Sequence, residues 1–224
     1  MNKIGRYIEY FLSIPKSLYF CCKYFPLSLA YKLPIFISWR TQLYKMKGKI
    51  IVDRSKIKTG GIKIEFGYVG IFDRKNSKSI WECDGKVIIN GKNISIGHGS
   101  KISVGKEAIL EIGNNFDITA ETQIICNKHI SIKNDVLISW QCLIMDTDFH
   151  NIYINNKKVN EDKEIIIHDH VWIGCRSTIL KGIEIYKNNI VASNSNVVKT
   201  VRQENVILGG NPANIIKRNI EWSK

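Results

Sequence analysis

The feature that most constrains the fold of this chain is an aliphatic period of six residues. The period is unbroken over one stretch, at Ile167, Ile173, Ile179, Ile185, Val191 and Val197. It recurs upstream in shorter blocks, at Ile96 and Ile102, at Ile112, Ile118, Ile124 and Ile130, and at Ile132, Ile138 and Ile144. An amphipathic helix would repeat about every 3.6 residues and a half-buried strand every second residue, and neither pattern fits. A period of six is typical of a hexapeptide β-helix.

In such a β-helix each hexad supplies one short strand and one turn, and three hexads close a triangular coil. The aliphatic residue points inward and stacks on its counterpart one coil away, at about 4.8 Å. Tripeptides such as "GNN", "KND" and "KNN" suit the corners, because Gly and Asn tolerate left-handed backbone angles. The sequence therefore predicts an all-β chain with a parallel β-helix over residues 96–210. Residues 50–95 predict further β-structure with looser spacing, an irregular β cap that closes or begins the β-helix.

One interruption of the period predicts a loop. The spacing of 23 residues between Ile144 and Ile167 is not a multiple of six, so residues 146–164 must leave the coil. Long excursions from a rigid scaffold tend to be functional. The stretch "DTDFH", which ends at His150, lies where this loop begins.

The end of the chain, residues 211–224, predicts a short helix that closes the coil. Pro212 would lie in its first turn, and Ile215, Ile216 and Ile220 would fall on one side.

The N-terminal segment, residues 1–49, differs in composition from the rest. The chain has a net charge of +13, and its first fifty residues hold nine Lys or Arg against Glu9 alone, with 11 of the 22 aromatic residues. Pro and Lys interrupt every apolar run before it could span a bilayer, and no export signal is apparent. Basic and aromatic residues together are typical of a segment at an anionic membrane surface, and equally of a helical cap on the main domain. Nucleic acid is not an expected partner, because no recognised binding module is present.

Six cysteines, without a CxxC pair, are expected to be reduced thiols in a cytoplasmic protein. Together with the N-terminal segment this predicts a cytoplasmic location, with peripheral docking on the inner face of the cytoplasmic membrane as a hypothesis.

The C-terminal motifs carry a resemblance to a known family. The runs "VWIGCRSTILKGIEIYKNNIVASNSNVVKTV" and "ILGGNPANIIKR" resemble the hexapeptide-repeat acyltransferases, which include galactoside, maltose and xenobiotic O-acetyltransferases. "DTDFH" is most similar to the branch associated with bacterial surface-polysaccharide biosynthesis. The resemblance implies a left-handed coil, a homotrimer with an active site at each subunit interface, acetyl-CoA as donor, and a sugar or polysaccharide-precursor hydroxyl as acceptor.

The resemblance also implies roles for individual residues. His150 matches the family's catalytic base, which suits an imidazole whose ordinary pKa lies near neutral pH. Asp146 and Asp148 could orient the imidazole, hold the acceptor hydroxyl or cap a turn. Trp140 could line the acceptor site or simply pack. Cys175 matches a position whose backbone N–H lies beside the thioester and could stabilise the oxyanion.

The remaining matches concern the coenzyme. Trp172 and Gly174 match residues that line the pantetheine channel, and the backbone of Ser193 matches a contact to a pantetheine amide. Lys199 and Lys217 match basic positions near the coenzyme's phosphates, as a multiply anionic ligand requires.

Other functions remain open at this stage. An N-acetyltransferase of an amino sugar would use the same histidine and coenzyme motifs, and a longer acyl donor is compatible with them. A carbonic anhydrase of the γ type uses a β-helix with zinc, but the other histidines, at 98, 129, 168 and 170, lack ligand spacing, so no metal site is expected. A trimeric scaffold without catalysis is the remaining alternative.

Overall fold

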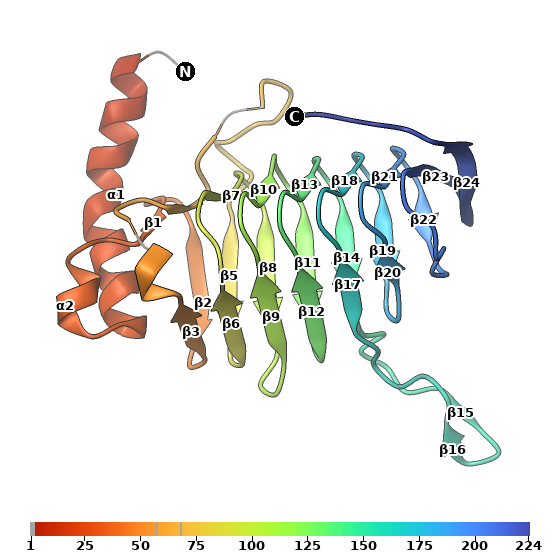
Figure 1. Cartoon of the computed structure of the whole chain (residues 1–224). Coiled ribbons are helices and arrows are strands. Elements are labelled where there is room, and N and C mark those ends of the chain that lie inside the picture. The colour runs from red at the N-terminus through yellow and green to blue at the C-terminus, as the bar shows by residue number, and fades with distance from the viewer. Residues whose placement is uncertain (1–2, 57, 68) are drawn as a thin grey trace.

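The structure, a computed structural model, describes residues 3–56, 58–67 and 69–224. Three parallel sheets wrap around one apolar core, with a long helix at one end and a hairpin at the other (Figure 1). The helical elements are α1 (Lys3–Tyr24), α2 (Leu27–Ala30) and the short 3-10 helix η1 (Arg54–Lys56).

Each sheet is assembled from strands that recur along the chain. Sheet A contains β1 (Ile35–Ile37), β4 (Ile62–Ile64), β7 (Ile94–Ile96), β10 (Asp117–Ile118), β13 (Leu137–Ile138), β18 (Trp172–Ile173), β21 (Ile190–Val191), β23 (Val206–Gly210) and β24 (Ala213–Arg218). Sheet B contains β2 (Gln42–Met46), β5 (Ile80–Cys83), β8 (Lys101–Val104), β11 (Gln123–Cys126), β14 (Leu143–Met145), β19 (Thr178–Leu180) and β22 (Asn196–Val197). Sheet C contains β3 (Lys49–Val52), β6 (Lys86–Ile89), β9 (Ile109–Ile112), β12 (His129–Ile132), β17 (Ile165–Ile167) and β20 (Glu184–Ile185).

The chain contributes one strand to sheet A, one to sheet B and one to sheet C in turn, and each round of three strands completes one coil. The predicted parallel β-helix is therefore confirmed. The three edges of the prism are named here by the sheets that they join: edge AB, edge BC and edge CA. Corner residues adopt left-handed angles, as Asn115 does at edge CA and Asn194 at edge AB.

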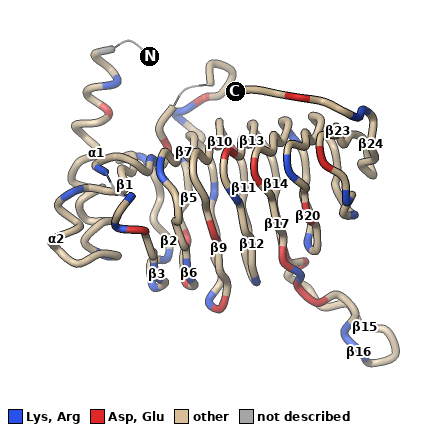
Figure 2. The backbone as a smooth tube through the Cα atoms, in the orientation of Figure 1, with Lys and Arg blue, Asp and Glu red and all other residues tan. Residues whose placement is uncertain are grey.

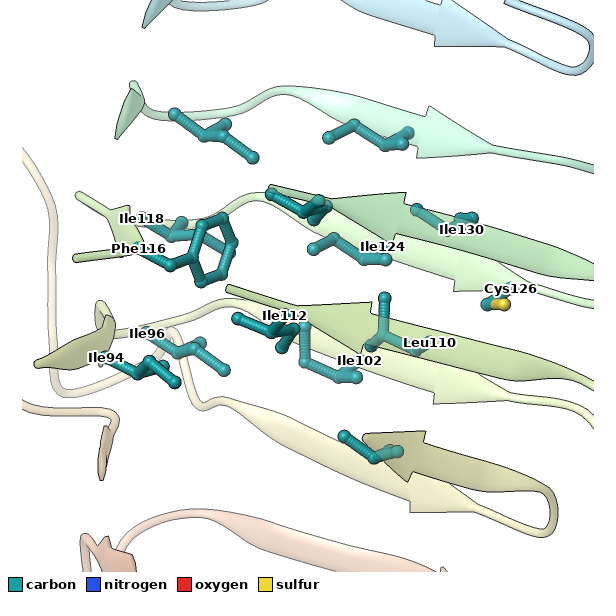
Figure 3. Close-up of a cluster of buried hydrophobic side chains, with 14 of the residues drawn as sticks. Ile94, Ile96, Ile102, Leu110, Ile112, Phe116, Ile118, Ile124, Cys126 and Ile130 are labelled. Carbon is teal, nitrogen blue, oxygen red and sulfur yellow. The ribbon is translucent and has the colours of Figure 1, made fainter. Parts of the chain in front are cut away.

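The six-residue period forms the core as the sequence predicts. Ile167 pairs with Ile185 one coil later, and Ile173 pairs in the same way with Val191. All four side chains are at most 1% exposed. Figure 3 shows the same stacking farther upstream, where Ile96 lies beside Ile118 and Ile102 beside Ile124. Burying one aliphatic side chain contributes about 1.5–3 kcal/mol, so this column of residues is the main source of stability.

The β-helix begins earlier than its predicted boundary at residue 96. Strands of all three sheets are already present from β1 onward, so residues 50–95 belong to the coil rather than to an irregular cap. The period is hidden there because residues 65–67 and 69–79, between β4 and β5, leave the second coil.

The predicted C-terminal helix is wrong. Strands β23 and β24 form an antiparallel hairpin in which Gly210 faces Ala213. Two glycines followed by Pro212 favour a tight reversal over a helical turn, and pairing satisfies the open backbone of β23. The end of the chain then runs back along the coil as an extended tail (Figure 1).

Helix α1 covers the first coil with the buried ring of Phe20, and its small polar side chains bond to β1. Ser17 Oγ accepts a hydrogen bond from the Ile37 N–H at 2.9 Å and donates to the Ile37 carbonyl at 3.1 Å. Cys21 Sγ donates to the Ile35 carbonyl at 3.3 Å. These bonds occupy the outer edge of β1, which is the first strand of sheet A among the strands that the structure describes. No helix in the described part of the chain has the length and apolar composition needed to cross a bilayer.

Candidate active site

The predicted loop is present, and it leaves the coil at edge BC. Residues 146–164 separate β14 in sheet B from β17 in sheet C. They carry the hairpin of β15 (Tyr153–Ile154) and β16 (Lys157–Lys158), which projects away from the prism (Figure 1). The "DTDFH" stretch forms the departure point of this loop, beside the coil that carries Lys181.

Asp146 is the structural anchor of the departure point. Its side chain is fully buried, and its carboxylate accepts hydrogen bonds from three consecutive backbone N–H groups of the preceding coil. The distances are 2.6 Å to Asn127, 2.9 Å to Lys128 and 2.8 Å to His129. Both carboxylate oxygens therefore accept hydrogen bonds from the backbone at edge BC. Of the three roles predicted for Asp146, this geometry matches the capping of a turn.

Asp148 faces the next coil instead. Its Oδ2 accepts hydrogen bonds from Lys181 Nζ at 2.5 Å and from Asn160 Nδ2 at 2.8 Å. The hydrogen bond from Lys181, assisted by that from Asn160, lowers the pKa of Asp148 below its ordinary value. Asp148 thus ties the first residues of the loop to both the loop's return segment and the coil.

His150 is held by its backbone while its ring stays free. The His150 N–H donates to the Asp148 carbonyl at 2.7 Å, and its own carbonyl accepts from Asn160 Nδ2 at 2.7 Å. The residue is exposed, and its imidazole has no hydrogen-bond partner among the described residues. Neither aspartate carboxylate is bonded to the ring, so an orienting role for Asp146 or Asp148 would act through the backbone.

Edge AB and the strand beside it carry four of the residues predicted to contact the coenzyme: Trp172, Gly174, Cys175 and Ser193. Trp172 is 36% exposed on the outer face of sheet A, and its indole N–H donates to Ser139 Oγ at 3.1 Å. A Cβ on Gly174 would lie 2.6 Å from the Ser193 backbone nitrogen, so only glycine fits between these two coils. The Cys175 backbone N–H has no acceptor within the described part of the chain and is available to a ligand.

The other predicted site residues are dispersed. Trp140 is half-buried at edge AB, where its carbonyl accepts from the Arg176 N–H at 3.0 Å. Lys199 follows β22, and Lys217 lies in β24; both are exposed, and neither ammonium has an acidic partner among the described residues. His150 at edge BC and Cys175 at edge AB lie at opposite ends of the strands of sheet B.

The remaining histidines face acidic or aromatic side chains: His129 and His168 lie beside glutamates, and His98 and His170 lie beside aromatic rings. His168 Nε2 lies 2.7 Å from Glu184 Oε1, and His170 occupies a left-handed corner where it stacks on Trp222 at 4.2 Å. His98 is fully buried, and burial lowers its pKa. Within the described residues no three His, Cys, Asp or Glu side chains are grouped so that they could hold a metal ion.

The sequence analysis did not predict two residues that hold the loop in place, Asn160 and Lys181. Asn160 also accepts from the Ile152 N–H through Oδ1 at 2.7 Å, so its amide closes the loop on itself. Lys181 Nζ reaches the Asn160 carbonyl at 2.9 Å. The signal that could have found Lys181 is the coil register, because Met145 pairs with Leu180 and so brings the residues that follow each strand together.

Replacing Lys181 by methionine is expected to raise the pKa of Asp148 toward its ordinary value. Because the folded pKa of Asp148 is depressed, the ion pair stabilises the fold above the unfolded pKa of about 3.9, and this contribution is lost as pH falls through the folded pKa. For so exposed a pair the contribution at neutral pH is below about 1 kcal/mol. Carboxyl NMR titration would measure the shift, with Lys157→Met on the hairpin as control. An unchanged Asp148 titration would contradict the assignment.

Comparison with known proteins agrees with this architecture. No protein-family model matches the chain. A polysialic acid O-acetyltransferase of Escherichia coli O1:K1 / APEC is 34% identical over 128 residues, which are 56% of this chain and 39% of that protein. The chain spans between 39% and 61% of the length of the first three curated relatives that it matches.

Solved structures show the same fold. The polySia specific acetyltransferase NeuO superposes with a TM-score of 0.53 at 24% identity, over 85% of this chain and 73% of that chain. A galactoside acetyltransferase in complex with coenzyme A superposes with a TM-score of 0.50 at 22% identity, over 59% of this chain and 64% of that chain. The chain therefore has the left-handed parallel β-helix fold of these acetyltransferase structures, and part of its sequence is similar to a curated polysaccharide O-acetyltransferase.

Proposed function

We propose that this protein transfers an acetyl group from acetyl-CoA to a sugar hydroxyl of a bacterial surface polysaccharide or its precursor. The observation that carries the proposal is His150, a free imidazole on a stretch of backbone that Asp146, Asp148 and Asn160 hold in place. A general base needs this combination of an open ring nitrogen and a fixed position. The names of the curated relatives, which are acetyltransferases acting on polysialic acid and galactosides, support the reaction class.

In this reaction His150 takes the proton of the acceptor hydroxyl as that oxygen attacks the thioester carbonyl. The negative oxygen of the tetrahedral intermediate is stabilised by a backbone N–H, for which Cys175 offers an unoccupied donor. When the carbon–sulfur bond breaks, the imidazolium returns the proton to the departing thiolate. The products are an acetyl ester and free coenzyme A, with no acyl-enzyme.

The acetyl-CoA site in this proposal follows edge AB toward the C-terminal end. Gly174 leaves room for the pantetheine arm beside Trp172, and the backbone of Ser193 lies on the next coil. Lys217 in β24 supplies positive charge toward the last coil, where the coenzyme's phosphates would lie, whereas Lys199 follows β22 at edge BC, the edge that carries His150.

The proposal requires a second copy of the chain, and we place the protein as a homotrimer. Cys175 lies level with Trp140, because the Arg176 N–H bonds to the Trp140 carbonyl. From Trp140 to Met145, where the loop leaves, the strand is roughly 17 Å long at about 3.3 Å per residue. One chain therefore cannot bring its own His150 to its own Cys175, whereas edge BC of one subunit can meet edge AB of another.

The test of the activity is acetyl transfer by the purified full chain. Coenzyme A release would be followed with neutral, acidic and amino sugars as acceptors, and the products analysed by mass spectrometry. Acetyl esters that mild base removes are expected. An amide product would make the protein an N-acetyltransferase, and absence of both coenzyme binding and transfer would overturn the proposal.

The shared site has its own test, complementation between two inactive variants. His150→Ala removes the base, and Ser193→Trp blocks the coenzyme channel on edge AB. In trimers assembled at random from equal amounts of both, about one site in four combines an intact His150 with an intact neighbour. Recovery of about a quarter of the wild-type activity is expected, and no recovery would contradict a site between subunits.

We also propose that α1 docks on the inner face of an anionic membrane. Its outward side is a continuous apolar stripe whose members are between 41% and 75% exposed: Ile4, Tyr7, Ile8, Phe11, Leu12, Ile14 and Tyr19. Glu9, the one acidic residue of the first fifty, is buried, whereas Arg6 and Lys23 are exposed (Figure 2). An apolar face bordered by cations matches an anionic lipid surface in charge.

Vesicle co-sedimentation tests this docking. The double variant Tyr7→Ser/Phe11→Ser is expected to lose binding to vesicles of phosphatidylglycerol and phosphatidylcholine, while Tyr153→Ser/Ile154→Ser on the loop hairpin keeps it. A change of oligomeric mass without any vesicle binding would instead assign the stripe to a subunit contact.

A further inference from the structure

The first coil carries a basic and aromatic groove at edge AB that the coenzyme site does not use. Its volume is about 730 Å³, and its walls include Lys16, Trp39, Arg40, Tyr44, Lys75 and Lys78. The groove lies between the start of sheet B and residues 75–78, which belong to the segment between β4 and β5 that leaves the second coil.

We propose that this groove is a distal subsite for an anionic oligosaccharide, which holds the acceptor chain several sugars away from the unit that is acetylated. The inference rests on the proposed function, since it extends the acceptor of that reaction. The following observations on charge, aromatic surface and position carry it.

The charge of the groove is positive and partly unneutralised. No acidic side chain lines it among the described residues. Lys75 and Lys78 are exposed, and neither ammonium has a partner in the described part of the chain. Lys16 and Arg40 are fixed instead: Lys16 Nζ donates to the Trp39 carbonyl at 2.6 Å, and Arg40 pairs with buried Glu65 at 3.7 Å. The groove thus has rigid basic walls and two free cations, the arrangement that binds carboxylates.

Two exposed aromatic rings border the same groove. Trp39 is 45% exposed and Tyr44 is 67% exposed. The Arg40 guanidinium lies over the Trp39 ring at 5.7 Å, a cation–π contact that holds the indole in place. Exposed indole and phenol faces pack against the apolar C–H face of a pyranose ring, and the neighbouring lysines then select sugars that carry a negative charge.

The groove and the proposed acetyl-transfer site lie on the same edge of the coil, edge AB. Successive corners of edge AB are linked by backbone hydrogen bonds, from Glu121 to His98, from Gln141 to Ala120, and from Arg176 to Trp140. Five coil steps separate the coil of Trp39 from that of Cys175, which at about 4.8 Å each is roughly 24 Å, the length of about five extended sugar residues.

A polar track fills the interval. A second hollow of about 590 Å³ shares Gln42 and Lys78 with the groove, and its lining mixes two basic side chains, Lys78 and Lys101, with two acidic ones, Asp73 and Glu121. Beyond it, Gln141 Nε2 donates to Glu121 Oε2 at 3.2 Å, and Arg176 Nε donates to Gln141 Oε1 at 3.0 Å. Because the proposed coenzyme residues run toward the C-terminal coils, the N-terminal part of edge AB is left for the acceptor.

The experiment compares Lys75→Ala/Lys78→Ala with wild type on acceptors of two lengths. Sialic acid oligomers, which carry a carboxylate on every unit, would be used at about two and about ten residues, beside neutral maltooligosaccharides. The ratio of the KM for the short oligomer to the KM for the long one is expected to fall about tenfold in the variant, with kcat on the long oligomer retained. The control Lys106→Ala/Lys157→Ala removes two exposed lysines outside the groove and should keep the wild-type ratio. An equal KM for both lengths in the wild type would overturn the inference while leaving the proposed function intact.

A binding arm is independent of catalysis. Titration of the long sialic acid oligomer into His150→Ala protein is expected to show binding that Lys75→Ala/Lys78→Ala weakens about tenfold, that Trp39→Ala also weakens and that Trp39→Phe preserves. No binding, or equal binding of a single-stranded DNA or of anionic vesicles at the groove, would overturn the assignment to an anionic glycan. If transfer fails for all acceptors but this binding holds, the proposed activity fails and the groove stands.

Discussion

Replacement of His150 by alanine is expected to reduce acetyl transfer by about 10²–10⁴-fold, the range that a general base contributes. The loss should appear in kcat, with coenzyme A affinity retained, because edge AB is untouched by the change. The fold should also be retained, since the imidazole is exposed and makes no hydrogen bond with a described residue. Steady-state kinetics on the best acceptor, beside calorimetric titration of coenzyme A, measure the two effects separately.

The matched control is His168→Ala. His168 is a partly buried surface histidine of sheet C whose Nε2 is already occupied by Glu184, so its removal should change transfer less than about twofold. Comparable losses in both variants would show that the effect is not specific to the loop and would remove His150 as the base.

The largest effect on stability is expected for Asp146→Ala. The change leaves three buried or partly buried backbone N–H groups of edge BC without an acceptor, and each hydrogen bond to a charged group contributes about 1.5–3 kcal/mol. The free energy of unfolding should fall by about 3 kcal/mol or more. Urea denaturation at fixed protein concentration would measure it, because assembly also contributes to stability.

Asp148→Ala is the comparison variant, because it removes a carboxylate of the same loop that makes an exposed ion pair and no bond to the backbone of edge BC. Its carboxylate is exposed and, among the described residues, bonds only to side chains of Lys181 and Asn160, so the expected loss is about 1 kcal/mol or less. If both aspartate variants lost equally little stability, Asp146 would not be the anchor that the three N–H contacts indicate. Asp148→Ala should nevertheless lower the activity, since it loosens the backbone that carries His150.

The core could be predicted from the sequence because the inward-facing positions of a hexapeptide coil follow from the local six-residue period. Each inward residue is specified by its position in its own hexad, so Ile173 and Val191 are found without knowledge of any distant contact. The loop over residues 146–164 was predictable for the same reason, since it breaks the phase between Ile144 and Ile167. The upstream coils were hidden because residues 65–79 destroy the phase there.

The geometry around His150 could not be predicted in the same way. Asp146 and Asp148 stand two residues apart and look equivalent in the sequence, yet one turns inward to the previous coil and the other outward to the next. Asn160 reaches Asp148 only because the loop returns alongside its own beginning. Such contacts depend on the path of an irregular segment, for which the period carries no information.

The C-terminal hairpin shows a limit of a different kind. Ile215, Ile216 and Ile220 are compatible with one side of a helix, but an unpaired strand edge at the end of a sheet outweighs that weak preference. Tertiary pairing decides the structure wherever local propensity is nearly neutral.

The way the two ends of the prism are finished limits its length. A parallel coil presents the same backbone pattern at each step, so a bare first or last coil would accept another molecule end to end and grow into a filament. At one end the Ser17 hydroxyl and the Cys21 thiol occupy the groups of β1 that a further coil would need. At the other end β24 runs antiparallel, which a continuing parallel coil cannot match. By covering β1, helix α1 therefore also blocks the end-to-end growth of the coil.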